Sequence, residues 1–176
     1  LDLVKVMGCG MDLKTKGKAI SEFDINNLRF GKVIICTDAD VDGYQIRTLV
    51  LAMIYRLMPE LIEAGKVYIA VSPLYEIIVG GKSYFAYNEK EKADILKKFE
   101  GKKVSVQRSK GLGENEPEMM SLTTMHPDTR RLQKIMPSDV KETAEVFDVL
   151  LGNDLQGRKE IIAICGREYI DLADIS

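Results

Sequence analysis

Three aspartates stand at alternate positions, Asp38, Asp40 and Asp42, directly after the apolar run at 33–37. Alternate residues of a strand share one face, so a chain leaving a buried strand here would bring several carboxylate oxygens to one point. Carboxylate oxygens, with water and phosphate completing the shell, are the usual ligands of Mg²⁺. The pattern therefore predicts a site for a hard divalent cation.

Two other interpretations of the acidic segment are possible. An EF-hand loop also opens with this spacing of aspartates. However, an EF-hand needs a Glu at the twelfth position of the loop, and this chain has Leu49 there. An EF-hand also needs a helix before the loop, whereas the preceding residues of this chain are a β-branched run typical of a strand. The EF-hand is therefore rejected. An Asp-rich surface turn without a metal stays open as the structural alternative.

A second glycine-containing motif, Lys-Gly-Leu-Gly-Glu at 110–114 (the KGLGE segment), follows a predicted strand that ends at Arg108. Two glycines permit a tight loop whose backbone approaches another surface, and Arg108 and Lys110 place positive charge beside it. Basic residues outnumber acidic ones from 97 to 134, which suits a phosphate backbone. A plain turn and a solvated surface of mixed charge are the alternatives.

Composition is that of a globular protein: 176 residues, 45% hydrophobic and 30% charged, with no run long enough to span a membrane. The three cysteines, Cys9, Cys36 and Cys165, lack paired spacing, so neither a disulfide framework nor a zinc site is expected. Cys36 is expected in the core. A reducing cytoplasm is the expected location, and a first residue other than Met suggests a piece of a longer protein.

The acids are expected at the carboxyl end of a parallel sheet. A strand at 32–37, an apolar stripe along one helix of about five turns up to Gly65, and a strand at 67–72 form a strand-helix-strand unit. Ligands of such sheets bind beyond the carboxyl ends of the strands, where Asp38 to Asp42 would lie.

Downstream, local signals predict further elements. Gly80-Gly81-Lys82 indicates a hairpin, and Asn88 with Glu91 indicates a capping box at the start of a helix that ends near Phe99. The remaining expected elements are strands at 103–108 and 132–136 and helices at 117–124, from 138 or 139 to Gly152, and at 158–165.

Together the stretches at 31–75, containing Thr-Asp-Ala-Asp-Val-Asp-Gly, and 107–131, containing Gln-Arg-Ser-Lys-Gly-Leu-Gly-Glu, resemble the C-terminal region of the B subunit of bacterial type II DNA topoisomerases. This group includes gyrase and topoisomerase IV. The resemblance implies a Toprim fold, an α/β parallel sheet flanked by helices and here lacking its first strand, over residues 1–136. It implies a small helical tail at 137–176 that contacts the A subunit.

The resemblance also assigns residues. Asp38 would reach both metal positions, Asp40 the second, and Asp42 would complete or support the cluster; the family's further Glu ligand has no counterpart in this sequence. Arg108 and Lys110 would contact DNA. Arg47 could contact DNA, neutralise the acids or form a surface ion pair. Departures from the family pattern at Tyr44-Gln45 and at His126 leave gyrase versus topoisomerase IV open.

The activity implied by the resemblance is ATP-dependent passage of one DNA duplex through a double-strand break. The cofactor would be Mg²⁺, with Mn²⁺ or Ca²⁺ able to replace it in binding, and ATP would bind only to an N-terminal domain outside this sequence. The partners would be double-stranded DNA and the A subunit, which supplies the attacking tyrosine, in an assembly of two A and two B subunits. The expected location is the bacterial cytoplasm, with the nucleoid, and the piece alone is expected to be inactive.

Two rival functions remain open. Another Toprim enzyme, a primase or an OLD-type nuclease, would share the acids but not the KGLGE segment or the tail. A fragment that only binds metal and a partner, without catalysis, is the other.

Overall fold

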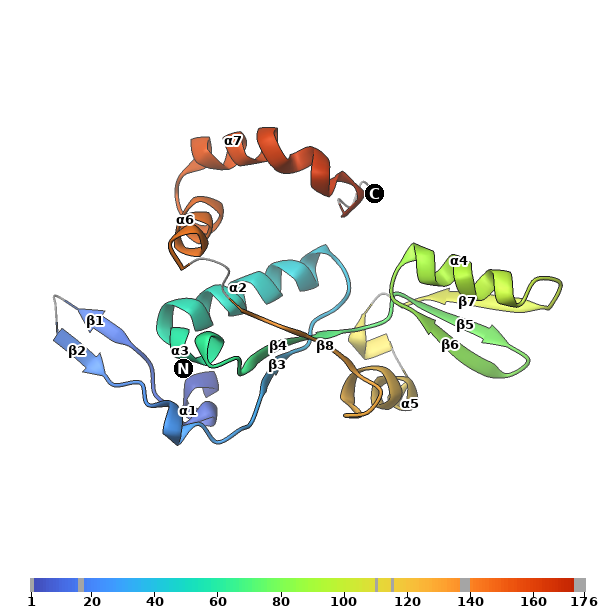
Figure 1. Cartoon of the computed structure of the whole chain (residues 1–176), viewed down its shortest axis with the longest axis horizontal. Coiled ribbons are helices and arrows are strands. Elements are labelled where there is room, and N and C mark those ends of the chain that lie inside the picture. Colours follow the sequence, from blue (N-terminus) through green and yellow to red (C-terminus); the bar gives the residue numbers. More distant parts are fainter. Residues whose placement is uncertain (1, 16–17, 110, 115, 137–139, 173–176) are drawn as a thin grey trace.

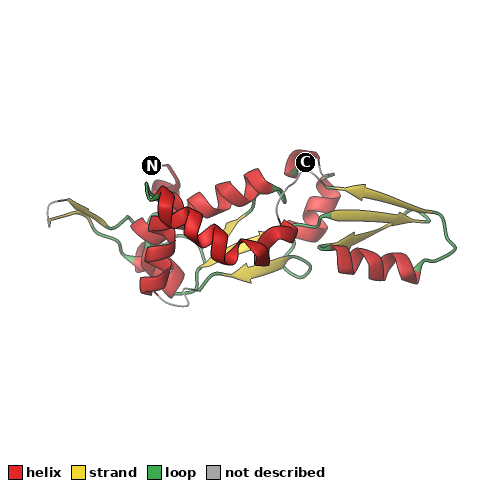
Figure 2. Ribbon diagram, turned by 90° about the horizontal axis from the view of Figure 1, so that it is seen from above, coloured by secondary structure: helices red, strands yellow, loops and turns green. Residues whose placement is uncertain are grey.

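A computed structural model describes residues 2–15, 18–109, 111–114, 116–136 and 140–172 of the chain. It is an elongated α/β molecule in which two separate three-stranded sheets lie end to end (Figures 1 and 2). Among the described residues, no helix is both long and apolar enough to cross a membrane.

The first sheet carries the acidic segment. Its strands are β3 (Val33–Ile35), β4 (Val67–Val71) and β8 (Arg131–Lys134), in the order β3-β4-β8, and β3 pairs with β4 in parallel while β8 is antiparallel. Helices α2 (Val41–Leu57) and α3 (Pro59–Glu63) connect β3 to β4. The predicted strand-helix-strand unit with its parallel pairing is therefore confirmed.

The prediction of one continuous five-turn helix in this unit is wrong. The chain breaks at Met58, whose φ of −148° is not helical, and α3 begins at Pro59. Proline lacks the backbone N–H needed inside a helix and disfavours helical geometry in the residue before it. The apolar stripe nevertheless remains on one side, since Ile54, Met58 and Leu61 are buried against β4 residue Val67 in one core.

Cys36 does not lie in this core, contrary to expectation. The strand ends at Ile35, which is 7% exposed, and Cys36 follows it as an exposed residue. The apolar run at 33–37 therefore extends two residues past the end of the buried strand.

The second sheet is antiparallel and is built from neighbouring segments. Its strands are β5 (Tyr75–Val79), β6 (Lys82–Ala86) and β7 (Val104–Arg108), in the order β6-β5-β7, and α4 (Glu89–Lys98) packs beside it. Gly80 and Gly81 have φ of +56° and +78°, as a two-residue hairpin turn requires. The Glu91 backbone N–H donates to Asn88 Oδ1 at 2.8 Å, so the predicted N-cap is confirmed.

The remaining elements lie around these two sheets. A helical hairpin of α6 and α7 lies over α2 (Figure 1), where the Tyr55 and Phe147 rings are 5.5 Å apart and Arg56 pairs with Asp148 at 2.6 Å. The residues expected to start that hairpin, 138 and 139, fall outside the described part. The other bounds are α1 (Asp2–Met7), β1 (Leu13–Thr15), β2 (Lys18–Ser21), a 3₁₀ turn (Ile25–Asn27), a second one (Leu112–Glu114), α5 (Pro117–Met120) with a π-helical turn (Ser121–Met125), α6 (Val140–Leu151), α7 (Leu155–Cys165) and a final 3₁₀ segment (Gly166–Leu172).

Candidate metal and nucleic-acid site

The acidic segment lies beyond the carboxyl end of β3, as predicted, but not as a continuation of the strand. Residues 36–40 form a loop, Asp40 is the N-cap of α2, and Asp42 is exposed in the first helical turn. Side chains two residues apart do not share a face of a helix. Within the described ranges, no three Asp, Glu, His or Cys side chains lie close enough together to hold one metal ion. The three carboxylates therefore do not meet in this structure, and metal binding by Asp38, Asp40 and Asp42 stays a prediction.

Asp40 and Gly43 fix the turn from loop to helix. Asp40 Oδ1 accepts a 2.7 Å hydrogen bond from the Gly43 backbone N–H, which satisfies one of the free donors at the start of α2. A Cβ built on buried Gly43 would lie 2.1 Å from the carbonyl oxygen of Asp38. This close approach admits only glycine.

Asp38 joins the two motifs. The Leu112 backbone N–H donates to Asp38 Oδ1 at 2.7 Å, although the two residues are 74 positions apart in sequence. Gly111 lies against the same carboxylate, because a Cβ built on Gly111 would be 3.8 Å from Asp38 Oδ2. Upstream, the Ser109 N–H donates to the Leu74 carbonyl at 2.9 Å, so the loop leaves β7 in a fixed direction. The sequence indicated a close backbone approach at these glycines but gave no sign that Asp38 was its target.

The predicted DNA-contacting cations are spread over separate elements. Arg47 is half-buried on α2, where its Nη2 donates to Thr37 Oγ1 at 3.4 Å and its guanidinium lies 5.0 Å from the centre of the Tyr44 ring. Arg108 is exposed at the end of β7, paired in register with Tyr75. Lys110 lies outside the described residues.

A small cavity beside Arg47, with both polar and apolar lining, was not foreseen from the sequence. It has a volume of about 120 Å³ and lies where β3, β4 and α2 meet, with Ser72 and Gln133 in its wall. Desolvation raises the pKa of the nearby Cys36 thiol, while the Ser72 hydroxyl and the Arg47 charge act against that rise. No local pattern in the sequence marks Ser72 or Gln133.

Comparison with known proteins agrees with this joining of two motifs. The family model described as "Toprim domain" matches residues 1–71, and the one described as "DNA gyrase B subunit, carboxyl terminus" matches residues 101–163. The first match covers the acidic segment and the second covers the KGLGE segment. The chain is similar to the Toprim and carboxyl-terminal parts of the DNA gyrase B subunit.

Several relatives are named as the B subunit of DNA gyrase. The protein from Thermotoga maritima is 42% identical over 92% of this chain, and the one from Thermus thermophilus is 45% identical over 91%. A relative from Synechocystis is 37% identical over 98% of the chain. The chain spans only 24%, 25% and 15% of these three proteins, respectively.

The residues of the acidic segment suit Mg²⁺ in donor chemistry. Mg²⁺ is commonly held by one or two carboxylates, with waters and substrate phosphates completing its shell. Asp38 and Asp40 are half-buried, and in each of them one oxygen accepts a backbone hydrogen bond while the carboxylate has a second oxygen to offer. These two residues are therefore the better candidates, and Asp42 is a weaker one.

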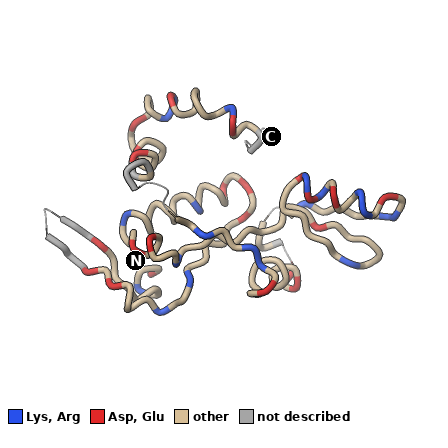
Figure 3. The backbone as a smooth tube through the Cα atoms, viewed as in Figure 1, with Lys and Arg blue, Asp and Glu red and all other residues tan. Residues whose placement is uncertain are grey.

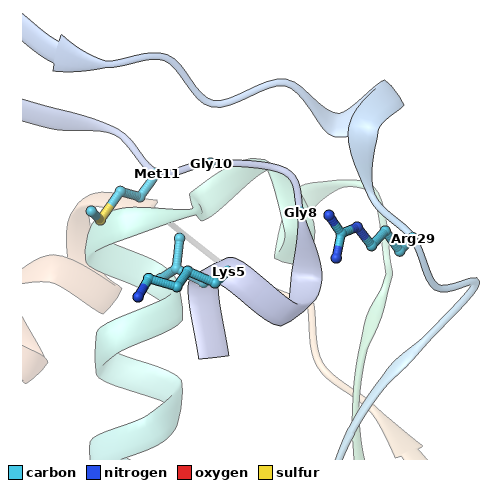
Figure 4. Close-up of a pocket in the computed structure, with 6 residues that line it drawn as sticks. Lys5, Gly8, Gly10, Met11 and Arg29 are labelled. Atoms are coloured by element: carbon cyan, nitrogen blue, oxygen red, sulfur yellow. The ribbon is translucent and has the colours of Figure 1, made fainter. Parts of the chain in front are cut away.

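A larger hollow lies by the amino-terminal helix, away from the acidic and KGLGE segments in sequence. It has a volume of about 440 Å³ and is lined by α1, the turn that follows it, and Arg29 (Figure 4). A Cβ on Gly8 would lie 2.7 Å from Arg29 Nε, so glycine permits this packing. None of the predicted site residues lines this hollow.

Charged residues also organise the antiparallel sheet, and acidic and basic residues are interspersed along the backbone of α4 in Figure 3. Glu89 accepts a hydrogen bond from the Tyr75 hydroxyl, which raises the pKa of Tyr75, and pairs with Lys92 at 3.2 Å. Arg131 of β8 pairs with Glu91 at 2.8 Å and lies 3.7 Å from the centre of the Tyr87 ring. The pair of Arg131 and Glu91 thus connects the two sheets.

Proposed function

We propose that this chain is the metal-binding part of an ATP-dependent type II DNA topoisomerase, with Asp38 and Asp40 as the principal Mg²⁺ ligands and Asp42 in support. The proposal is carried by the 2.7 Å hydrogen bond from Leu112 to Asp38, because it joins the acidic segment to the KGLGE segment in one place. A backbone donor to one oxygen orients the carboxylate toward a ligand. When bound, Mg²⁺ would stabilise negative charge on the phosphate and on the departing sugar oxygen.

The chain's own residues supply the remaining parts of this site. Asp40 holds the start of α2 through Gly43, which keeps the acidic loop in one conformation. Arg47, Arg108 and Lys110 are proposed to contact the DNA backbone, Arg108 as an exposed cation at the end of the strand that leads into the KGLGE segment.

The remaining components of the reaction are assigned to other parts of the assembly. The attacking tyrosine would come from the A subunit, and ATP would be hydrolysed by a domain outside this sequence, in an assembly of two A and two B subunits working on chromosomal DNA in the cytoplasm. Residues 137–176 form the proposed tail that contacts the A subunit. The exposure of Ile162 and Ile164 on α7, 65% and 78%, supports a partner for this surface.

The test uses the full-length B protein assembled with the A subunit, and measures Mg²⁺-dependent cleavage of duplex DNA. Asp38→Asn and Asp40→Asn should each lower cleavage by about a hundredfold or more, because each removes charge that faces the metal. Asp40→Asn keeps the helix cap, so its unfolding midpoint should stay near that of the wild type, whereas Asp40→Ala should also lose about 1 kcal/mol of stability.

Asp94→Asn is the matched control, since Asp94 is an exposed acid on α4, and it should cleave normally. Full cleavage by Asp38→Asn at low Mg²⁺ concentration would contradict the assignment. Cleavage by the B protein without the A subunit would instead favour a nuclease or another Toprim enzyme.

A further inference from the structure

The antiparallel sheet and α4 form a module, residues 72–109, whose far end carries a cluster of lysines. The turn between β5 and β6 and the start of β7 lie at this end, because Val79 pairs with Lys82 on one side and with Val104 on the other. The last turn of α4 leads into the same end through the loop before β7. It is the right-hand end of the molecule in Figure 1, away from α2 and β3. This lysine tip consists of Lys82, Lys97, Lys98, Lys102 and Lys103.

Charge is divided unevenly between this module and the rest of the chain. Residues 72–109 contain eight basic and five acidic residues, which leaves 17 of the 25 basic and 22 of the 27 acidic residues to the remainder. Within the module, Glu89 and Glu91 pair with basic side chains at the start of α4, the end opposite the lysine tip. The loop between α4 and β7 adds one acid, Glu100. The excess of positive charge in the module is therefore concentrated at the lysine tip.

The charges of the lysine tip are not neutralised within the described part of the chain. All five side chains are exposed, and none of them forms an ion pair with another described residue. The helix dipole favours lysines in the last turn of α4, but it gives no reason for Lys82 and Lys103, which lie in two other segments. A cluster of one sign, drawn from three segments, produces a local positive potential that attracts polyanions.

We propose that the lysine tip binds the phosphate backbone of duplex DNA, at a distance from the acidic segment. Lysine ammonium groups bind phosphates as point charges and do not read sequence. The inference rests on the proposed function, because it takes duplex DNA as the substrate.

Strand β7 sets the distance between the lysine tip and the KGLGE segment. The strand runs from Val104 at the tip to Arg108 beside that segment, and four steps of extended chain span about 14 Å. Successive phosphates of one DNA strand are about 3.4 Å apart along the duplex axis. For a duplex that runs along the module, the lysine tip contacts phosphates about four base pairs or more from those near Arg108.

The experiment measures binding of a fluorescently labelled DNA duplex to the full-length B protein, in EDTA, over a series of salt concentrations. The test variant combines Lys82→Gln, Lys98→Gln and Lys103→Gln, one from each segment of the tip. It should bind about tenfold more weakly, and the slope of log affinity against log salt should become shallower by about 2 to 3, because each phosphate contact contributes about 0.9. The loss should be the same for duplexes of different sequence, since backbone contacts carry no sequence information.

Two further variants control for charge and position. Arginine at the same three positions should keep both the affinity and the slope, because the charge is retained. A variant that combines Lys5→Gln, Arg29→Gln and Lys32→Gln removes the same amount of charge from exposed positions outside the module, and it should bind like the wild type. Circular dichroism melting of each variant would show that the fold is kept.

An unchanged salt slope in the folded tip variant, or an equal loss in the variant outside the module, would overturn the proposal. Normal DNA binding by the tip variant with weakened assembly on the A subunit would also overturn it, and would assign the lysine tip to a protein partner.

Binding in EDTA is independent of metal, so the two proposals can fail separately. A shallower slope in the tip variant, together with full Mg²⁺-dependent cleavage by Asp38→Asn, would support the lysine tip and overturn the metal ligands. An unchanged slope, together with lost cleavage by Asp38→Asn, would overturn the lysine tip and leave the metal ligands standing.

Discussion

The two sheets of this molecule are built in opposite ways. In the antiparallel sheet, β5, β6 and α4 follow one another, and each junction is held by neighbours in sequence, such as Gly80-Gly81 in the hairpin and Asn88 at the helix start. At the acidic segment, the decisive contact joins Asp38 to Leu112, which the whole antiparallel sheet separates in sequence. One region is organised locally, and the other depends on the return of a distant segment.

The two regions therefore have different roles in the structure. The antiparallel sheet has its own small core around Ile77 and Ala86, both 0% exposed, so its strands are held without the acidic segment. Its last strand, β7, then leads through Ser109 to the KGLGE segment. The locally built sheet thus acts as a support that presents the KGLGE backbone to Asp38.

The largest loss of stability and of DNA cleavage is expected from Gly43→Ala. This substitution tests the region of the acidic segment, where α2 approaches the Asp38 backbone closely. A Cβ there would meet the Asp38 carbonyl at 2.1 Å, and a backbone atom cannot move aside as a flexible side chain could. We expect a loss of about 3 kcal/mol, at the upper end for overpacking, and a displaced Asp38 that abolishes Mg²⁺-dependent cleavage. Urea unfolding and the cleavage assay measure the two effects.

Gly113→Ala is the control for this prediction, since a Cβ at Gly113 would have no neighbour within 4 Å. It should unfold at the same urea concentration as the wild type. A Gly43→Ala protein of normal stability and activity would show that the approach of α2 to Asp38 is not as close as the structure has it.

A smaller and purely local effect is expected at Gly80. Its φ of +56° is unfavourable for residues with a Cβ, but no atom lies within 4 Å, so Gly80→Ala should cost about 1 kcal/mol through backbone conformation alone. Gly80→Asn should recover most of this loss, because asparagine tolerates that region. DNA cleavage should stay normal in both variants, and a cleavage defect would mean that the hairpin affects the site directly.

The same contrast explains what the sequence could predict. The Gly80-Gly81 hairpin and the Asn88 cap follow from signals within a few residues, and the structure confirms them. The parallel β3–β4 pair follows from one continuous strand-helix-strand pattern, and the structure confirms it as well. The proximity of Leu112 to Asp38 has no such signal, because tertiary packing sets it. The separation of Asp42 from Asp38 was missed since the strand pattern was extended past Ile35, whereas α2 begins at Val41.

The smallest effect concerns the ion pair between the two regions. Arg131 lies on the sheet of the acidic segment and Glu91 on the helix of the other, and their hydrogen bond lowers the pKa of Glu91. A carboxyl whose pKa is lower when folded stabilises the protein above its unfolded pKa of about 4.3 and loses that contribution as pH falls through the folded value. Since the Glu91 and Arg131 side chains are 32% and 51% exposed, respectively, the gain should stay below about 1 kcal/mol.

Glu91→Gln isolates this charge interaction, because an amide oxygen can still accept from the Tyr87 N–H that Glu91 now binds at 3.2 Å. The variant should be less stable than the wild type at pH 7, and urea unfolding should show the gap narrowing as pH falls below about 4.3 and closing once the folded Glu91 carboxyl is protonated. Glu118→Gln, at an exposed acid of α5, should show no gap at neutral or acidic pH. A gap that persists after Glu91 is protonated would mean that packing around the Tyr87 ring, rather than charge, connects the two sheets.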